Sequence, residues 1–309
     1  MPLFSISDQQ LTVIEQANFG LEKALQGLIE KNLKAVFNCR FVASEYPTGA
    51  AHAGRIDTLA LSEDGNPVII EYKKVESSEL INQSLYYLAW INDHQGDFEI
   101  AVQRALGTSV QVDWSAVRVI CIAPNYRKYD LYAVQAMGVN IELWTYRLYK
   151  KQLLHMEEIL QRSLTPTAPK GGGKKTPTLT GKKMAIDTPP PAYTFDQHLE
   201  GKPEKVRTLA MAFQEFILRI DPAIEEAPKK LYVAYRTSQN IVCMEVQANR
   251  LLLFVKLNPK EVPDAPKISR DVSSIGHYGT GDFELSVKTP EDLEIAKPYV
   301  QLAYNKIGG

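Results

Sequence analysis

Hydrophobic side chains recur at helical spacing in some stretches of this chain and at strand-like spacing in others. Helical spacing predicts helices over residues 8–37, with a break near 18–20, over 79–92 and over 131–137. Alternating or continuously apolar runs predict strands over residues 39–45, 55–61, 68–73, 117–123 and 141–147. Strands and helices in this order are typical of an α/β fold, a mixed sheet flanked by helices.

The periodicity stops where Gly, Pro, Thr and Lys dominate the composition, which predicts a flexible linker. It resumes in a set of shorter elements, with helices near residues 209–217 and 290–307 and strands at 231–235, 241–246, 251–257 and 283–287. We therefore expect an α/β domain at residues 1–161, a linker at 162–194 and a small α+β domain at 195–309.

Residues 54–74, GRIDTLALSEDGNPVIIEYKK, read as a β-hairpin, because two strand-like runs flank an Asp-Gly turn. Side chains two residues apart on a strand share a face, so Glu71 and Lys73 point one way and Tyr72 points the other. A two-residue loop would pair Asp57 with Tyr72 and place it on the wrong face. A three-residue loop pairs Asp57 with Glu71 or Lys73 and gathers the polar side chains, and we predict this loop.

Two interpretations of these polar residues stay open on the residues alone. Asp57 and Lys73 can form a cross-strand ion pair on a solvent-facing side of the sheet. The apolar run at residues 68–70 instead indicates a strand buried on both faces, where a charge is costly unless it is paired or bound to a metal.

This hairpin resembles that of the PD-(D/E)XK nuclease superfamily and, within it, of the NucS/EndoMS-like branch. The pattern G-x-I-D-x-L, an acidic-Gly turn and V-x-x-E-x-K is carried by Gly54, Ile56, Asp57, Leu59, Asp64, Gly65, Val68, Glu71 and Lys73. Ile56 stands where the nominal proline would precede the aspartate. The flanking residues that resemble the branch are Glu45, Tyr46 and Thr48 before the hairpin and Gln83 and Tyr87 after it. The resemblance covers most of residues 1–160 and implies an α/β/α restriction-endonuclease-like core.

The resemblance also implies a metal site. Asp57, Glu71 and the backbone carbonyl of Tyr72 would bind Mg²⁺ or Mn²⁺, which are hard cations that take oxygen ligands. Lys73 would position the attacking water and offset developing charge, and Gln83 would orient water or backbone. The implied reaction is hydrolysis of a DNA phosphodiester to a 5′-phosphate and a 3′-hydroxyl.

A further ligand is implied in the first helix. Related nucleases place a Glu there, ten residues before an Asn that matches Asn32, and this spacing selects Glu22. Glu30 lies eight residues along, a little more than two helical turns, and is the alternative. A solvated helix face is the plainer interpretation of either side chain.

The formal net charge of −1 conceals an uneven distribution, with −5 on residues 1–161, +5 on residues 162–195 and −1 on residues 196–309. A nucleic-acid-binding surface on the first domain must therefore be local. Weak candidates for DNA contacts are Tyr87, Arg127, Lys128 and the linker lysines Lys174 and Lys175.

Three cysteines, Cys39, Cys121 and Cys243, are widely spaced in apolar runs and indicate reduced, buried thiols. No stretch approaches the ~20 apolar residues of a membrane span, and the first residues lack a signal pattern. We therefore expect a cytoplasmic protein with no membrane partner.

Two hypotheses follow from the resemblance. The first is a metal-dependent DNA endonuclease, a hydrolase acting in DNA repair or phage defence on single-stranded, branched or mismatched DNA. The second is a catalytically silent module that keeps the fold and binds nucleic acid or protein. The presence of Asp57, Glu71 and Lys73 favours the first. The oligomeric state stays open, a homodimer included.

The second domain resembles a domain of unknown function found behind such nuclease-like domains, so its ligand is unknown. Its glycine-rich loop at residues 276–282 is followed by a strand, not by the helix N-terminus of a phosphate-binding loop. Arg270, Asp271 and His277 form a weak second candidate site near this loop.

Overall fold

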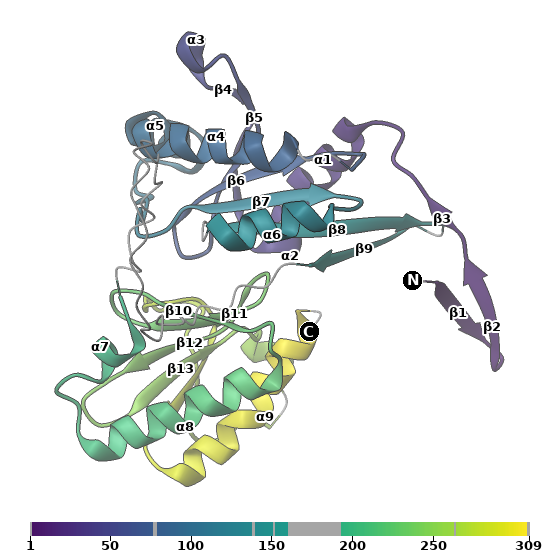
Figure 1. Ribbon diagram of the computed structural model, residues 1–309. Coiled ribbons are helices and arrows are strands. Elements are labelled where there is room, and N and C mark those ends of the chain that lie inside the picture. The colour runs from purple at the N-terminus through teal and green to yellow at the C-terminus, as the bar shows by residue number, and fades with distance from the viewer. Residues whose placement is uncertain are drawn as a thin grey trace, which may run out of the picture.

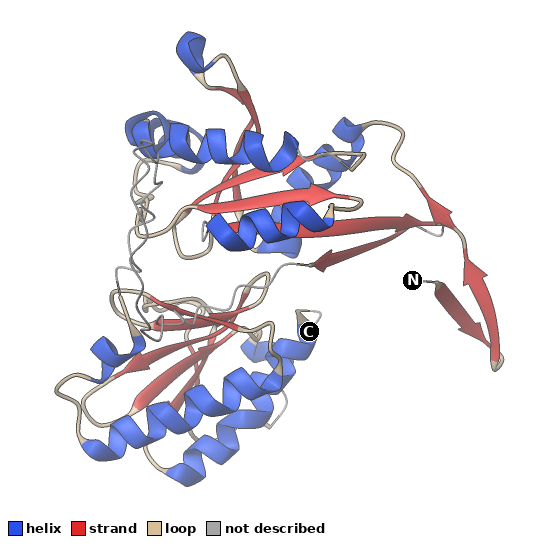
Figure 2. Cartoon of the chain, in the orientation of Figure 1, coloured by secondary structure: helices blue, strands red, loops and turns tan. Residues whose placement is uncertain are grey.

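A computed structural model describes residues 2–76, 79–137, 140–150, 152–159, 193–262 and 264–307. Within these ranges the chain forms two sheets with separate cores and an N-terminal β-hairpin (Figures 1 and 2). The expected boundary at residues 161 and 162 lies outside the described residues, as do Lys174 and Lys175. In the described part of the chain, no helix is both long and apolar enough to cross a bilayer.

The first sheet has seven strands in the order β3-β8-β7-β6-β5-β4, with β9 paired to β8. The strands are β3 (Gln16–Ala17), β4 (Arg40–Pro47), β5 (Arg55–Leu61), β6 (Pro67–Tyr72), β7 (Arg118–Ala123), β8 (Ile141–Tyr149) and β9 (Leu153–Glu158). The pairs β6–β7 and β7–β8 are parallel and the others are antiparallel, so the sheet is mixed as predicted.

Helices cover both faces of this sheet. One face packs on α1 (Glu22–Lys31) and α2 (Leu33–Phe37), and the other packs on α4 (Glu79–Asp93), α5 (Gln95–Leu106) and α6 (Lys128–Met137). The short α3 (Gly49–His52) joins β4 to β5. Every residue of β6 and of β7 is buried, which explains their continuous apolar runs. The predicted α/β class is confirmed.

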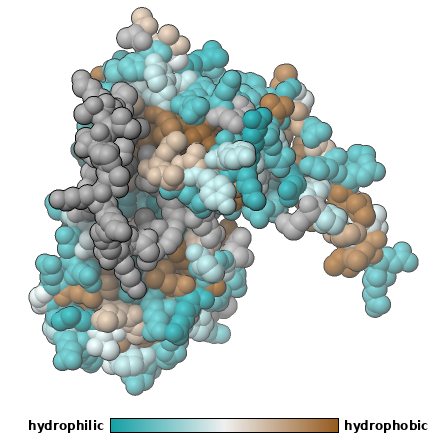
Figure 3. Space-filling view, in the orientation of Figure 1, coloured by the Kyte–Doolittle hydropathy of each residue, from teal (hydrophilic) through white to brown (hydrophobic). Residues whose placement is uncertain are grey.

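The N-terminal segment differs from the prediction, because the helix predicted from residue 8 begins only at Glu22. Before it, β1 (Leu3–Ser7) and β2 (Gln10–Ile14) form an antiparallel hairpin that projects from the body (Figure 1). Its apolar residues alternate with polar ones, a period that fits a strand and not a helix. Exposed apolar side chains lie along this arm, where Figure 3 shows hydrophobic atoms: Phe4, Ile6, Leu11 and Val13.

The second sheet is antiparallel, with six strands in the order β10-β11-β12-β13-β15-β14. The strands are β10 (Glu225–Pro228), β11 (Val233–Arg236), β12 (Asn240–Val246), β13 (Leu251–Val255), β14 (Ser269–Asp271) and β15 (Phe283–Val287). The predicted strands match β11, β12, β13 and β15, whereas the short edge strands β10 and β14 were not predicted.

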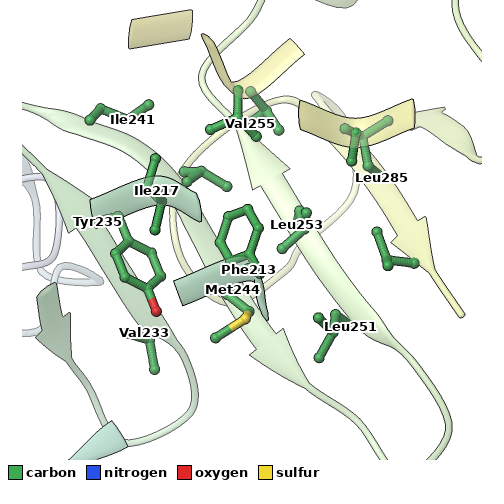
Figure 4. Close-up of a cluster of buried hydrophobic side chains, with 14 of the residues drawn as sticks. Phe213, Ile217, Val233, Tyr235, Ile241, Met244, Leu251, Leu253, Val255 and Leu285 are labelled. Carbon is green, nitrogen blue, oxygen red and sulfur yellow. The ribbon is translucent and has the colours of Figure 1, made fainter. Parts of the chain in front are cut away.

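Helices α8 (Glu204–Ile220) and α9 (Pro290–Lys306) cover one face of the second sheet, with the short α7 (Phe195–Leu199) beside them and the 3₁₀ turn η1 (Pro259–Glu261) after β13 (Figure 1). Phe213 and Ile217 of α8 pack on Tyr235, Met244 and other strand residues (Figure 4). The fold class predicted here, a small α+β unit, is also confirmed.

The two sheets meet at the loop between β5 and β6. The carboxylate of Glu63 accepts hydrogen bonds from the Asn240 backbone N–H and the Thr280 hydroxyl, and it pairs with Lys256 at 3.2 Å. Lys229 reaches in the other direction and donates to the Asn66 amide oxygen at 2.6 Å. The second sheet with its helices, called here the second unit, therefore contacts the turn of the hairpin that carries Asp57 and Glu71.

Candidate active site

The turn of the β5–β6 hairpin sets the register of the candidate site. The Ser62 N–H donates to the Asn66 carbonyl at 2.9 Å, which leaves residues 63–65 as a three-residue loop. Gly65 adopts a φ of +83°, a left-handed conformation that favours glycine. The predicted loop length is confirmed.

The same register pairs Thr58 with Ile70, so Asp57 comes opposite Glu71 one residue further on. Main-chain pairing between the two strands ends at Thr58, although β5 begins at Arg55 and β6 continues to Tyr72. Backbone N–H groups in this gap therefore need other acceptors.

Two carboxylates fill the gap where the strands separate. Glu71 Oε1 accepts the backbone N–H of Asp57 at 3.0 Å, and Asp57 Oδ2 accepts the backbone N–H of Tyr72 at 3.1 Å. Each strand thus contributes a side chain that accepts a backbone N–H group of the other strand. The register of the three-residue loop thus brings the two acids together, as predicted.

Burial perturbs both acids. Glu71 is fully buried, and loss of solvation raises its pKa to about 9, with the negative charge of Asp57 as the next cause. Loss of solvation also raises the pKa of Asp57, against the opposing effects of the Tyr72 N–H and of Lys73. A buried acid beside a half-buried one is costly when both are anions, so a cation between them would be stabilising.

One atom of this pair has no hydrogen-bond partner among the described residues. Glu71 Oε2 is buried and unpartnered, although buried polar atoms are normally satisfied. The possible metal ligands here are carboxylate oxygens and the Tyr72 carbonyl oxygen. Mg²⁺ and Mn²⁺ prefer such hard oxygen ligands. The residues therefore fit a divalent cation of this kind.

Lys73 and Glu22 lie at the edge of this pair. The Lys73 ammonium is 3.8 Å from Glu22 Oε1, and its positive charge acts on both Asp57 and Glu71. Glu22 Oε2 accepts the backbone N–H of Lys74 at 3.0 Å, and this bond anchors the start of α1 to the end of β6. Both carboxylate oxygens of Glu22 thus contact the segment formed by Lys73 and Lys74.

Glu30, the alternative ligand, faces a different environment. Its carboxylate accepts the Thr58 hydroxyl at 2.7 Å and the Gln26 amide at 3.0 Å. The Thr58 hydroxyl also donates to the Tyr72 hydroxyl, and Tyr72 and Glu71 point to opposite faces of β6, so Glu30 lies on the face opposite Glu71. Of the two glutamates, the structure brings only Glu22 beside Lys73.

Gln83 and Tyr87 do not reach the acids but hold the strand that carries Asp57. Gln83 Nε2 donates to the Tyr87 hydroxyl at 3.0 Å, and that hydroxyl donates to the Arg55 carbonyl at 2.8 Å. A Cβ at Gly54 would lie 2.8 Å from the Tyr87 ring, so only glycine lets the ring pack so closely here. Both residues that the helix signature singled out therefore position backbone.

Of the weak nucleic-acid candidates, Arg127 and Lys128 lie on the surface near this edge, whereas Tyr87 is buried and is not placed to contact DNA. Arg127 and Lys128 are exposed at the start of α6, and Arg127 pairs with Glu76 at 2.9 Å. β7 precedes this segment and runs parallel to β6, so the two cations follow a strand end next to that of Glu71.

Sequence reasoning missed Gln26, and it named Glu45 only as part of the resemblance, without a role in the site. Gln26 Nε2 donates to the Asp57 carbonyl at 2.8 Å, and Glu45, at a bend of β4 with a φ of +53°, pairs with Lys23 and Arg55. Gln26 lies four residues before Glu30, a spacing that places both side chains on one side of the helix. The sequence does not show that this side of the helix contacts the hairpin. Across the described ranges, no three His, Cys, Asp or Glu side chains converge as a ready-made metal cluster.

Comparisons with known proteins match different parts of the chain. Residues 195–304 match the model of a domain of unknown function, DUF5655. An uncharacterized protein of Haemophilus influenzae is 28% identical over 307 residues, which covers 98% of this chain and 99% of that protein. The shared length extends through both sheets.

Among solved structures, the chain is similar to a complex of EndoMS with double-stranded DNA and to a repair endonuclease from Pyrococcus abyssi. The first is 20% identical, covers 42% of this chain and 46% of that chain, and has a TM-score of 0.24. The second is 18% identical, covers 40% and 47%, and has a TM-score of 0.22. The chain thus spans less than half the length of these structures. Apo EndoMS is similar at a TM-score of 0.25 and 17% identity.

Proposed function

We propose that the chain is a metal-dependent endonuclease that hydrolyses phosphodiester bonds in DNA. The observation that carries this proposal is the buried Glu71 carboxylate, with an unpartnered oxygen, directly beside Asp57 where two strands separate. A purely structural ion pair would leave no free oxygen, whereas a cation site needs one. The sequence pattern of the hairpin, which resembles PD-(D/E)XK nucleases, supports the same function.

Asp57, Glu71 and the Tyr72 carbonyl would hold Mg²⁺ or Mn²⁺, with Glu22 joined through water. When bound, the cation would polarise the scissile phosphate and lower the pKa of a coordinated water. The ammonium of Lys73 is placed to hold the attacking water and to offset charge that develops on the phosphate. Gln26 and Tyr87 keep the strand of Asp57 in place through its backbone. The products would be a 5′-phosphate and a 3′-hydroxyl.

A cleavage assay with a matched pair of variants tests this proposal. Asp57→Asn keeps the size of the side chain and an acceptor for the Tyr72 N–H but removes the charge. Asp93→Asn makes the same change at an exposed position of α4. With Mg²⁺ or Mn²⁺ present, we expect Asp57→Asn to lose at least about a hundredfold in rate on single-stranded, branched, mismatched or plain duplex DNA, and Asp93→Asn to match wild type.

Equal rates for wild type and Asp57→Asn would refute the assignment of the site. Calorimetric titration of Mn²⁺ gives a second readout, since Asp57→Asn should weaken binding about 10- to 100-fold even where no substrate is cut.

The alternative function is a module that binds DNA or protein without cutting it. The specific observation in its favour is that no third acidic, His or Cys side chain joins Asp57 and Glu71 as a ready-made cluster in the described part of the chain. No Mn²⁺ binding and no cleavage on any of the four substrates would select this alternative.

A further inference from the structure

The second sheet carries a polar cleft on the face that its helices leave uncovered. Arg250, Ser286 and Lys288 lie on that face, beyond Leu252 and Phe254, which Val272 covers. The cleft has a volume of about 420 Å³ and lies within the range of about 300–1,000 Å³ that is usual for small-molecule sites. Its other lining residues are Lys267, Ile268, Ser269, Arg270, Glu284 and Asp292.

Strand register places two cations side by side in this cleft. Leu251 pairs with Val287 in the antiparallel β13–β15 ladder, so Arg250 comes opposite Lys288 one residue further on. Like charges directly opposite each other across two strands repel. A bound anion would relieve this repulsion.

The two carboxylates that line the cleft are already committed. Glu284 pairs with Arg270 at 2.6 Å. Asp292 accepts the backbone N–H groups of Lys288 and Thr289 at 2.9 and 3.1 Å, as part of the cap that starts α9. Among the described residues, neither acid forms an ion pair with Arg250 or Lys288.

The guanidinium of Arg250 is held in place before any ligand arrives. Its Nε donates to Gln247 Oε1 at 2.8 Å, and its Nη1 donates to the Ser286 hydroxyl at 3.3 Å. A fixed arginine fork beside a lysine and a hydroxyl is well suited to the tetrahedral oxygens of a phosphate. The exposed Lys267 adds a further cation at the rim.

We propose that this cleft binds the phosphate of a nucleotide or of a nucleic-acid strand, with Arg250 and Lys288 as its principal ligands. A single phosphate would fill only part of the cleft, so the group is carried by a larger molecule. The site gives the domain that matches a family of unknown function a role of its own. It does not depend on the proposed nuclease activity, because it lies in the other sheet and needs no metal.

The test uses the full chain with EDTA, so that no cleavage occurs. Binding of a fluorescent short oligothymidylate is measured by anisotropy, and binding of AMP and inorganic phosphate is measured by calorimetry. The variant Arg250→Gln/Lys288→Gln is compared with Lys205→Gln/Arg207→Gln, which removes the same charge from the exposed surface of α8. Lys288→Gln alone leaves the hydrogen bonds of Arg250 intact and guards against misfolding.

Loss of the two ligands should weaken binding by about tenfold or more. For the oligonucleotide, the slope of log affinity against log salt should also fall by about 1.4. Binding of the strand that shows both effects identifies nucleic acid as the source of the phosphate. Binding of AMP but not of the strand, lost in the variant, identifies a nucleotide. Binding of inorganic phosphate without either would contradict the proposal of a larger ligand.

Hydrogen–deuterium exchange with the oligonucleotide locates the contact independently of total affinity. Protection over residues 249–256 and 283–292 is expected, and it should disappear in the double variant but persist in the α8 control. Protection confined to the β5–β6 hairpin, unchanged affinity for every probe, or no binding of any probe would overturn the proposal. Because the exchange at residues 54–74 is read separately, failure of this site and failure of the nuclease site are distinguishable.

Discussion

The hydroxyl of Tyr232, in the second unit, donates to Asp64 Oδ1 at 2.7 Å in the turn of the β5–β6 hairpin. The side-chain amide of Asn240 donates to the same oxygen at 3.0 Å. Asp64 Oδ2 is buried and lacks a partner among the described residues. The turn whose strands carry the candidate site is therefore stabilised by groups that lie more than 160 positions away in the sequence.

Removing this hydroxyl should destabilise the fold. Tyr232→Phe leaves the half-buried Asp64 with one donor fewer, and we expect a loss of about 1–3 kcal/mol in the free energy of unfolding. Urea denaturation measures the loss, and Tyr278→Phe, at an exposed tyrosine of the same unit, should stay within about 0.5 kcal/mol of wild type. Equal stability of the two variants would mean that Asp64 does not depend on Tyr232.

Local patterns in the sequence were enough to predict the hairpin but not what holds it. The Asp-Gly turn and the two strand-like runs predicted the hairpin, and the gathering of polar side chains favoured the three-residue loop that the structure has, with Asp57 opposite Glu71. The contacts of Tyr232 and Asn240 with that turn join segments remote in the sequence, and no local pattern encodes them. The prediction of the first helix failed because a local pattern was misleading. Leu11 and Ile14 fit a helical period by chance, while tight turn geometry at Asp8 and Gln9 made them part of a hairpin.

Gly54 should tolerate no side chain. In Gly54→Ala the new Cβ would lie 2.8 Å from Tyr87 Cε1 and 3.1 Å from Thr48 Oγ1, which displaces the ring whose hydroxyl holds Arg55. We expect a loss of about 1–3 kcal/mol in stability.

The control for this substitution is the same change in α1. Nothing lies within 4 Å of a Cβ built at Gly27, and alanine is the better helix former, so Gly27→Ala should stabilise the fold by about 0.5–1 kcal/mol. Thermal melts of the two variants should shift in opposite directions. A neutral Gly54→Ala would show that Tyr87 moves without cost.

Glu71 should make stability depend on pH when no metal is present. At low pH its carboxyl is protonated in both the folded and the unfolded chain. Above about pH 4.5 the unfolded chain ionises, while the folded carboxyl stays protonated until about pH 9. Stability therefore falls as pH rises through this window, by up to about 1.4 kcal/mol per pH unit from this group.

Glu71→Gln removes that dependence. In EDTA, the free energy of unfolding of wild type should decline more steeply than that of the variant between pH 5 and 9, whereas Glu157→Gln, at an exposed position of β9, should follow wild type. Parallel curves for wild type and Glu71→Gln would show that the carboxyl ionises freely in the folded state.

Lys73 and Lys74 offer a matched test of the catalytic assignment, because the two neighbours face different surroundings. Lys73 is half-buried and its ammonium acts on both candidate acids, whereas Lys74 is exposed and donates to the Gly20 carbonyl at 3.3 Å.

If Lys73 holds the attacking water, Lys73→Gln should lower the cleavage rate at saturating DNA at least about a hundredfold. Mn²⁺ affinity, measured by calorimetry, should not weaken, since a cation near the two acids is removed. Lys74→Gln should change neither quantity by more than about twofold. Similar rate losses in both variants would instead indicate a general contribution of positive charge to DNA binding, and the separate role of Lys73 would be withdrawn.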